Sequence, residues 1–252
     1  MLNVQTIGTD TAQPPLLIVH GLFGSGRNWG VIAKRLSSDR RVLAVDMRNH
    51  GDSFHADSQS YPDMADDLAE VIDAEGGTAD VVGHSMGGKA AMVLALTRPA
   101  FVQSLTVADI APVGYEHSQA HLIKAMRDLD LTAISTRSDA DAALADAIAE
   151  RETRAFLLQS LDMRNKAWKL NLDVLERDMD QITGFPDVSG QYEGPAFFLS
   201  GGSSDYVGPE HRARIKTLFP QAKQARIPGA GHWLHAEKPR EFEAALRAFL
   251  GL

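Results

Sequence analysis

One short stretch constrains the fold of this chain more than any other, the sequence Val81-Val82-Gly83-His84-Ser85-Met86-Gly87-Gly88. Two β-branched residues precede a Gly-x-Ser-x-Gly pattern, and an apolar run without Gly or Pro follows to residue 96. The pattern predicts a buried strand that turns sharply into a buried helix, which is typical of a nucleophile elbow. Such a turn holds its serine in a strained conformation, with the hydroxyl exposed above the helix N-terminus. We therefore predict that Ser85 is a nucleophile.

Composition and charge exclude several classes of protein. The 252 residues include 25 Lys and Arg against 33 Asp and Glu, a formal net charge of −8, so we expect no nucleic acid as a partner. The absence of cysteine excludes disulfides, thiolate metal sites and a cysteine nucleophile. Residues 1–6 lack the features of a signal peptide, and the early apolar run Leu16–Val19 is too short to span a bilayer. We expect a cytoplasmic protein that is not integral to a membrane, and leave its oligomeric state open.

Apolar strand patterns alternate with helical patterns along most of the chain. This alternation predicts an α/β fold with a mostly parallel central sheet flanked by helices. Ligands of such sheets bind beyond the carboxyl ends of the strands, where His20, Asp46, Ser85 and Asp109 are expected. We expect strands over 2–7, 16–19, 41–45, 104–108, 195–200 and 224–227, and helices over 29–36, 61–75, 209–219 and the last residues of the chain.

The pattern changes in the middle of the chain, because no Gly or Pro occurs between Tyr115 and Thr183. Apolar residues recur there at helical spacing. We interpret residues 113–192 as a helical cap, inserted after the strand that ends near Asp109. Residues 1–112 and 193–252 would then form one core domain.

A serine hydroxyl needs a positioned base to accept its proton. In the expected fold the base comes late in the chain, and His232 lies in the Gly-rich stretch Gly229–Trp233 between the last strand and the last helix. We predict that His232 is the general base. Two carboxylates follow core strands and are candidates to orient it, Asp109 and Asp205.

The oxyanion of the tetrahedral intermediate needs hydrogen-bond donors. We predict the backbone N–H of Met86, directly after the nucleophile, and that of Leu22 in the loop after His20-Gly21, with Phe23 as the next candidate. Phe23, Tyr206 and Trp233 are also candidates to line the substrate pocket, although each is equally compatible with core packing.

These residues together resemble the α/β-hydrolase superfamily, and more closely the small bacterial YbfF-type esterases and their mitochondrial relatives. The resemblance implies that the triad acid is Asp109, that a helical cap covers the pocket, and that no cofactor is needed. Asp205 stands where proline is expected in this group, at the commoner acid position of the wider superfamily. The motifs that carry the resemblance are residues 20–25, 46–51, 83–89, 109–112 and 231–239.

We therefore expect a serine carboxylesterase that hydrolyses small-molecule acyl esters of short to medium chain length. The reaction would use a Ser-His-Asp triad and an acyl-enzyme intermediate, with no metal or cofactor. An acyl thioesterase of the acyl-CoA type is the alternative within the same chemistry, followed by a lyase or a carbon–carbon hydrolase. A hydrolase-fold ligand receptor with little turnover is the alternative from a different class.

Overall fold

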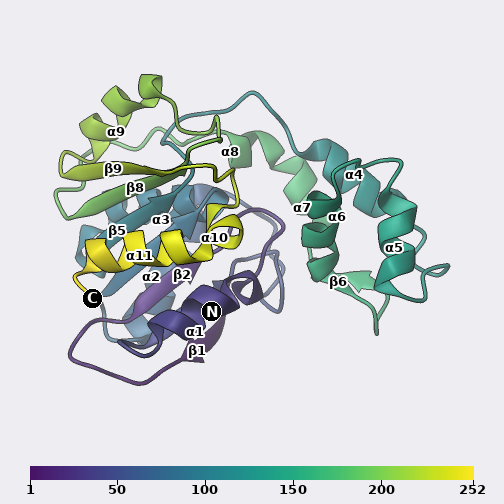
Figure 1. The fold of residues 1–252 in the computed structure, drawn as a ribbon, viewed down its shortest axis with the longest axis horizontal. Coiled ribbons are helices and arrows are strands. Elements are labelled where there is room, and N and C mark those ends of the chain that lie inside the picture. Colours follow the sequence, from purple (N-terminus) through teal and green to yellow (C-terminus); the bar gives the residue numbers. More distant parts are fainter.

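The computed structural model describes residues 1–252 and contains a seven-stranded sheet in the order β1-β3-β2-β4-β5-β8-β9 (Figure 1). Strand β1 is antiparallel to β3 at one edge, and all other neighbouring strands are parallel. The predicted α/β fold with a mostly parallel sheet is therefore confirmed. The strands are β1 (Asn3–Ile7), β2 (Leu16–Val19), β3 (Val42–Asp46), β4 (Ala79–His84), β5 (Val102–Ala108), β8 (Ala196–Gly201) and β9 (Ala222–Ile227).

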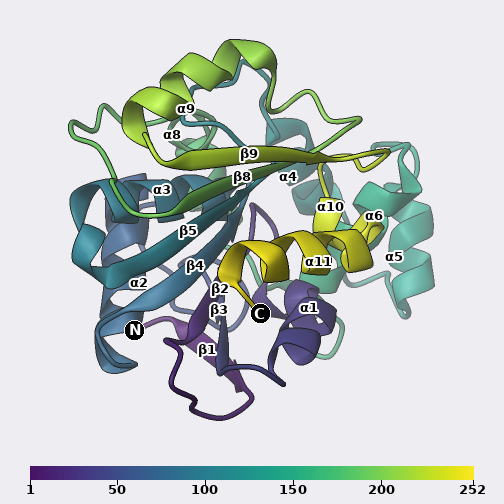
Figure 2. The same cartoon turned by 60° about the vertical axis from the view of Figure 1, so that its left-hand side comes forward.

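Helices cover both faces of this sheet (Figures 1 and 2). Every residue of β2 is buried, and successive side chains join different apolar clusters, Leu17 and Val19 on one face and Leu16 and Ile18 on the other. This alternation is the period of two of a β-strand. The first face packs against α2 (Tyr61–Ala74), α3 (Met86–Thr97) and α9 (Arg212–Leu218), and the second against α1 (Gly30–Leu36) and α11 (Pro239–Leu250).

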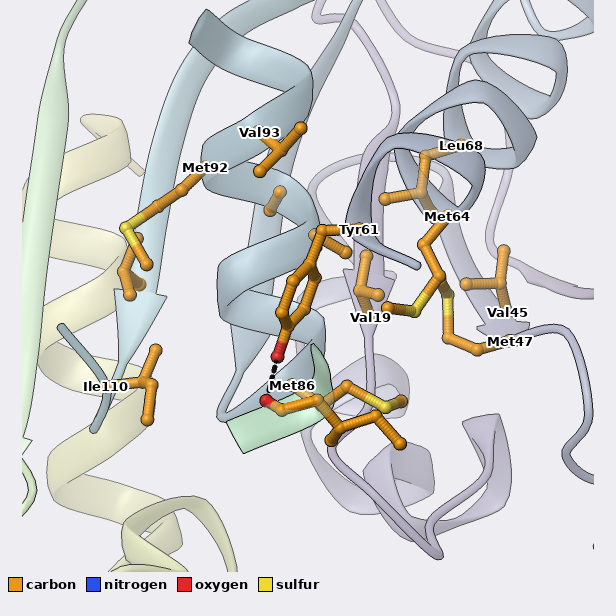
Figure 3. Close-up of a cluster of buried hydrophobic side chains, with 14 of the residues drawn as sticks. Val19, Val45, Met47, Tyr61, Met64, Leu68, Met86, Met92, Val93 and Ile110 are labelled. Atoms are coloured by element: carbon orange, nitrogen blue, oxygen red, sulfur yellow. Dashed lines mark hydrogen bonds between the residues drawn. The ribbon is translucent and has the colours of Figure 1, made fainter. Parts of the chain in front are cut away.

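Side chains of α2, α3 and the strands pack together in the larger cluster (Figure 3). Helix α2 begins after Ser60, whose hydroxyl accepts the N–H of Asp63 and so satisfies one free donor of the first turn. The helix buries Met64 and Tyr61 against its neighbours. The Tyr61 hydroxyl donates a hydrogen bond of 2.5 Å to the carbonyl of Ile182, shown as the dashed line in Figure 3. A core helix is thereby joined to the segment that precedes β8.

The segment between β5 and β8 lies beside the sheet, at the right of Figure 1. Its regular elements are mainly short helices, and it also contains a two-stranded hairpin that the helical spacing does not indicate. The elements are α4 (Ala120–Asp128), α5 (Arg137–Leu144), α6 (Arg151–Leu157), β6 (Leu161–Asp162), β7 (Ala167–Trp168), α7 (Leu172–Arg177) and α8 (Met179–Thr183).

Side-chain hydrogen bonds explain the unexpected hairpin. The Asp162 carboxylate accepts the backbone N–H groups of Arg164 and Asn165 at 2.9 and 3.0 Å, and Lys166 has a φ of 52°. An aspartate that bonds the backbone two and three residues ahead favours a turn over a helix. The helical spacing of apolar residues carries no information about this local competition, so the sequence pattern alone predicts a helix here.

The helices of the chain are short compared with a bilayer. The longest, α2, has 14 residues, whereas about 20 apolar residues are needed to cross the hydrocarbon layer. None of the helices combines the length and the apolar character of a membrane span. The remaining short elements are α10 (Leu234–Glu237) and single 3-10 turns at Gly26–Trp29, Pro99–Phe101, Leu158–Ser160 and Pro209–His211.

The packing of α3 on the sheet predicts a specific need for glycine at position 87. A Cβ atom on Gly87 would lie 2.3 Å from the carbonyl oxygen of His20 and 2.5 Å from that of Val19, both main-chain atoms that cannot turn away. We expect Gly87→Ala to lower the free energy of unfolding by about 3 kcal/mol, the upper part of the usual cost of overpacking.

The matched control is Gly30→Ala. Gly30 begins α1 with a right-handed helical conformation, and a Cβ there would meet nothing within 4 Å. Alanine at this position should stabilise the protein by about 0.5 kcal/mol through its higher helix propensity. Urea unfolding of both variants and the wild type measures the difference, and equal stability of the two variants would contradict the packing argument.

Candidate active site

Ser85 lies in a strained turn between β4 and α3. Its backbone angles are φ 52° and ψ −120°, a conformation that residues with a Cβ atom rarely adopt. The turn is tight because Gly83 and Gly87 lie so close that a Cβ on Gly83 would come within 2.4 Å of the Gly87 carbonyl oxygen. Ser85 lines the main cavity of the protein at the N-terminus of α3. This is the geometry that the Gly-x-Ser-x-Gly pattern predicts.

His232 and Asp109 meet at the carboxyl edge of the sheet. Asp109 follows β5 with a φ of 52° and is fully buried, and His232 lies in the loop after β9. The His232 Nδ1–H donates to Asp109 Oδ2 at 2.8 Å, across 123 positions of sequence. The His232 side chain is 19% exposed and lines the same cavity as Ser85. With Nδ1 bonded to the carboxylate, Nε2 is the nitrogen left to exchange protons with a reacting group.

Two further groups hold the Asp109 carboxylate. The backbone N–H of Gly201 donates to Oδ1 at 2.8 Å, and the hydroxyl of Ser204 donates to Oδ2 at 2.5 Å. These three hydrogen bonds fix the position of the buried carboxylate and therefore the orientation of the His232 ring that is bonded to it. The role of Ser204 is not evident from the sequence, although its place in a Gly-rich loop directly after β8 could have suggested it.

Asp205, the other sequence candidate for the acid, is placed differently. It is exposed, and its carboxylate makes no hydrogen bond with His232. Its neighbour Tyr206 instead contacts the imidazole, stacking on His232 with ring centroids 3.9 Å apart. Of the two carboxylates, only Asp109 is bonded to the histidine.

The loop after β2 lies directly against the nucleophile. A Cβ atom on Gly21 would be 3.2 Å from the Ser85 Cβ. The next two residues, Leu22 and Phe23, line the cavity together with Met86. The backbone N–H of Leu22 makes no hydrogen bond within the protein, and that of Met86, as the first residue of α3, has no acceptor inside its helix. Both amides are thus available to a ligand.

The amide of Phe23 corrects one expectation from the sequence. It was a candidate oxyanion donor, but the structure shows it donating to His50 Nε2 at 3.2 Å. An N–H bonded to a buried acceptor is not free for an intermediate in the cavity. Only the side chain of Phe23 remains a candidate contributor to the pocket.

The cavity has a volume of about 400 Å³. Each of the three predicted pocket side chains lies on its wall, namely Phe23, Tyr206 and Trp233. The lining also includes Tyr61 and Met86, two members of the buried apolar cluster drawn in Figure 3. Other apolar lining residues come from the core and from the segment between β5 and β8, namely Ile110, Leu122, Phe156 and Ile182.

Four further histidines surround this site and are buried. Burial is the largest cause that lowers the pKa of each, to about 3 for two of them and well below the usual value for a third. They are therefore neutral at physiological pH and serve as fixed hydrogen-bonding groups or stacked rings. His84 donates its Nε2–H to the backbone carbonyl of His232 at 2.8 Å, which fixes the loop of the candidate base. The four are His20, His50, His84 and His235.

Lys89 is a site feature that the sequence reasoning missed. It lies one helical turn after Ser85, lines the cavity and is buried, and burial lowers the pKa of its ammonium to about 7. Its Nζ donates to the carbonyls of Thr183 and Gly184 at 2.7 and 2.5 Å. These bonds tie the helix that carries Ser85 to the end of α8.

Comparison with known proteins agrees with this geometry. Residues 16–245 match the alpha/beta hydrolase family. The chain is 42% identical to sn-1-specific diacylglycerol lipase ABHD11 of Mus musculus, covering 99% of this chain and 85% of that protein. It is 38% identical to esterase YbfF of Escherichia coli, covering 99% and 98%.

A solved structure gives the same result for the fold. The structure of a marine microorganism esterase superposes with a TM-score of 0.93 at 38% identity and covers 98% of both chains. The strand order, the serine turn and these similarities together show that the chain belongs to the alpha/beta hydrolase family, close to the YbfF-type esterases.

Proposed function

We propose that this protein is a serine carboxylesterase whose nucleophile is Ser85. The observation that carries the proposal is the hydrogen bond between His232 and the buried carboxylate of Asp109, at the cavity into which the strained turn of Ser85 opens. The names of the relatives, an esterase and a lipase, support ester hydrolysis as the reaction. The family alone would leave the chemistry open.

In the proposed mechanism the Ser85 hydroxyl attacks the ester carbonyl carbon while His232 Nε2 accepts its proton. Asp109 stabilises the imidazolium that forms and holds the ring in the tautomer with hydrogen on Nδ1. His232 then gives the proton to the departing alcohol, which leaves an acyl group on Ser85. A water molecule, deprotonated by the same histidine, hydrolyses the acyl-enzyme and restores the serine.

The oxyanion of each tetrahedral intermediate would be bound by the backbone N–H groups of Leu22 and Met86. Both residues line the cavity, and the loop that carries Leu22 touches Ser85 through Gly21. The N-terminus of α3 adds a favourable electrostatic field for the negative charge. Such preformed donors stabilise the transition state without reorganising when charge develops.

The acyl group would occupy the apolar part of the cavity, with short to medium chains favoured by its volume of about 400 Å³. Phe23, Tyr206 and Trp233 would line this substrate site. Residues 113–192 would act as a cap over it, on a core formed by residues 1–112 and 193–252. The support for a cap is that cavity residues such as Leu122 and Phe156 come from this segment.

The first test removes the nucleophile. Ser85→Ala should lower ester turnover by at least about 10⁴-fold, since no other group can form the acyl-enzyme. The thermal midpoint should stay near that of the wild type, because alanine tolerates the same space. Steady-state hydrolysis of 4-nitrophenyl butyrate and a melting curve measure both quantities. Residual activity near the wild-type level would exclude Ser85 as the nucleophile.

The second test separates the two acid candidates. Asp109→Asn should lower kcat by about 10⁴-fold, because an amide does not favour the required tautomer or stabilise the imidazolium. Asp205→Asn is the matched control, an exposed residue of the same type in the loop beside Tyr206, and should change kcat by less than about twofold since its carboxylate is not bonded to His232. The opposite ranking would assign the acid to Asp205.

The third test concerns the substrate. Values of kcat/KM for 4-nitrophenyl esters from acetate to palmitate should reach a maximum at a short or medium chain and fall for palmitate, which exceeds the apolar cavity. Acyl-CoA thioesters of the same chain lengths should be poorer substrates. A preference for thioesters would favour an acyl thioesterase, and absence of turnover on every substrate would favour a ligand receptor.

A further inference from the structure

The peptide groups around Phe23 are held from both sides by distant parts of the chain. Phe23 has a φ of 64°, in the left-handed region that an aromatic residue rarely adopts. Its N–H donates to His50 Nε2 at 3.2 Å, and its carbonyl accepts the Ser160 hydroxyl at 2.8 Å. The Gly24 N–H donates to the Gly21 carbonyl at 3.0 Å and closes a turn around Leu22 and Phe23. Positive φ at the third residue is the mark of a type II turn, in which glycine is usual.

The two residues that hold Phe23 are themselves joined through the hairpin β6–β7. The Ser160 carbonyl accepts the N–H of Lys169 at 2.8 Å, and the Lys169 carbonyl accepts the N–H of Gly51 at 2.8 Å. Gly51 follows His50 directly, so the hydrogen bonds return to Phe23 and form a closed ring. Ser160 and His50 are both buried, and bonds in a buried network are strengthened by the low local dielectric.

His50 is suited to a fixed accepting role. Its Nδ1–H donates to the Arg48 carbonyl at 2.8 Å, which leaves the lone pair of Nε2 for Phe23. Burial, followed by the neighbouring His20 and by His55, lowers the pKa of His50 to about 3, whereas the hydrogen bond to the Arg48 carbonyl and the charge of Asp46 oppose this shift. The imidazole of His50 is therefore neutral at the pH of an esterase assay. A protonated His50 could not accept the hydrogen bond from the Phe23 N–H.

The turn that this ring holds carries the Leu22 amide. Catalysis by an oxyanion donor depends on the position of its N–H group to within a fraction of an ångström. A strained aromatic residue next to the donor persists only where its surroundings overdetermine it. His50 and Ser160 supply this constraint from two different parts of the fold.

We propose that His50 and Ser160 are positioning residues that lock the turn around Phe23 and so hold the Leu22 N–H in place for the oxyanion. The inference rests on the proposed function and extends it. Ser160 belongs to the segment between β5 and β8, so this segment contributes to stabilisation of the transition state as well as covering the pocket.

The test compares Ser160→Ala and His50→Leu with the wild type in hydrolysis of 4-nitrophenyl butyrate. Loss of an oxyanion donor typically lowers the rate by about 10²-fold or more, so a displaced donor should lower kcat by about tenfold while KM changes by less than about twofold.

The probe of the oxyanion site is an alkyl trifluoromethyl ketone, which forms a tetrahedral adduct with Ser85. Its affinity should fall in parallel with kcat/KM, since it resembles the transition state. The double variant should lose less than the product of the two single losses, because both act on Phe23.

Two controls separate positioning from a general loosening of the structure. Lys169→Ala removes the ion pair of Lys169 Nζ with Asp52 at 2.6 Å, a side-chain contact between the same two parts of the fold, but leaves every bond of the ring. It should match the wild type in kcat and in ketone affinity. His50→Gln restores an acceptor near the position of Nε2 and should recover part of the activity lost in His50→Leu.

The outcomes are distinguishable from failure of the proposed function. If the wild type shows Ser85-dependent turnover but folded Ser160→Ala and His50→Leu variants both keep its kcat and ketone affinity, His50 and Ser160 do not position the donor. A lower melting temperature with unchanged ketone affinity would likewise reduce them to structural residues. If Lys169→Ala lowers kcat and ketone affinity as much as Ser160→Ala does, a general loosening of the structure is responsible, and the ring of hydrogen bonds around Phe23 is not. Absence of Ser85-dependent turnover in the wild type would overturn both proposals.

Discussion

The close approach of α3 to the carboxyl end of β2 is the constraint on which the rest of this structure depends. The helix begins so near the main chain of Val19 and His20 that position 87 has no room for a side chain. The chain must therefore leave β4 through a sharp turn, and Ser85 takes the positive φ of that turn. The same approach brings the loop of Gly21 against Ser85. The close packing of α3 on β2 therefore also brings Ser85 and the Gly21 loop together at the candidate site.

The electrostatics of the site follow from burial. Four histidines near the cavity have their pKa values lowered by desolvation and act as neutral hydrogen-bonding or stacking groups. His232 differs from them in that it donates a hydrogen bond to a buried carboxylate, that of Asp109. Residues of one type therefore have two roles here, and the difference lies in their partners.

The segment between β5 and β8 is integrated with the sheet domain. Apolar residues of its helices, such as Leu122 and Leu175, belong to the same buried cluster as strand residues such as Val81. Polar contacts add to this continuity, since Tyr61 and Lys89 bond main-chain carbonyls at the end of α8. A segment held in this way can shape the pocket and, as we propose for Ser160, the loop beside the nucleophile.

The sequence by itself determined the order and type of most elements, because strands covered on both faces and amphipathic helices leave periodic patterns in nearby residues. It also indicated Ser85 as the candidate nucleophile, through the local pattern of its flanking strand and helix, and His232 as the candidate base, through its loop near the C-terminus. Only the tertiary structure decided which carboxylate bonds His232, that Ser204 supports it, and that His50 occupies the Phe23 amide. It also revealed the hairpin β6–β7. The partners in these contacts are up to 137 positions apart, as for Ser160 and Phe23, and no local pattern records a hydrogen bond made across the fold.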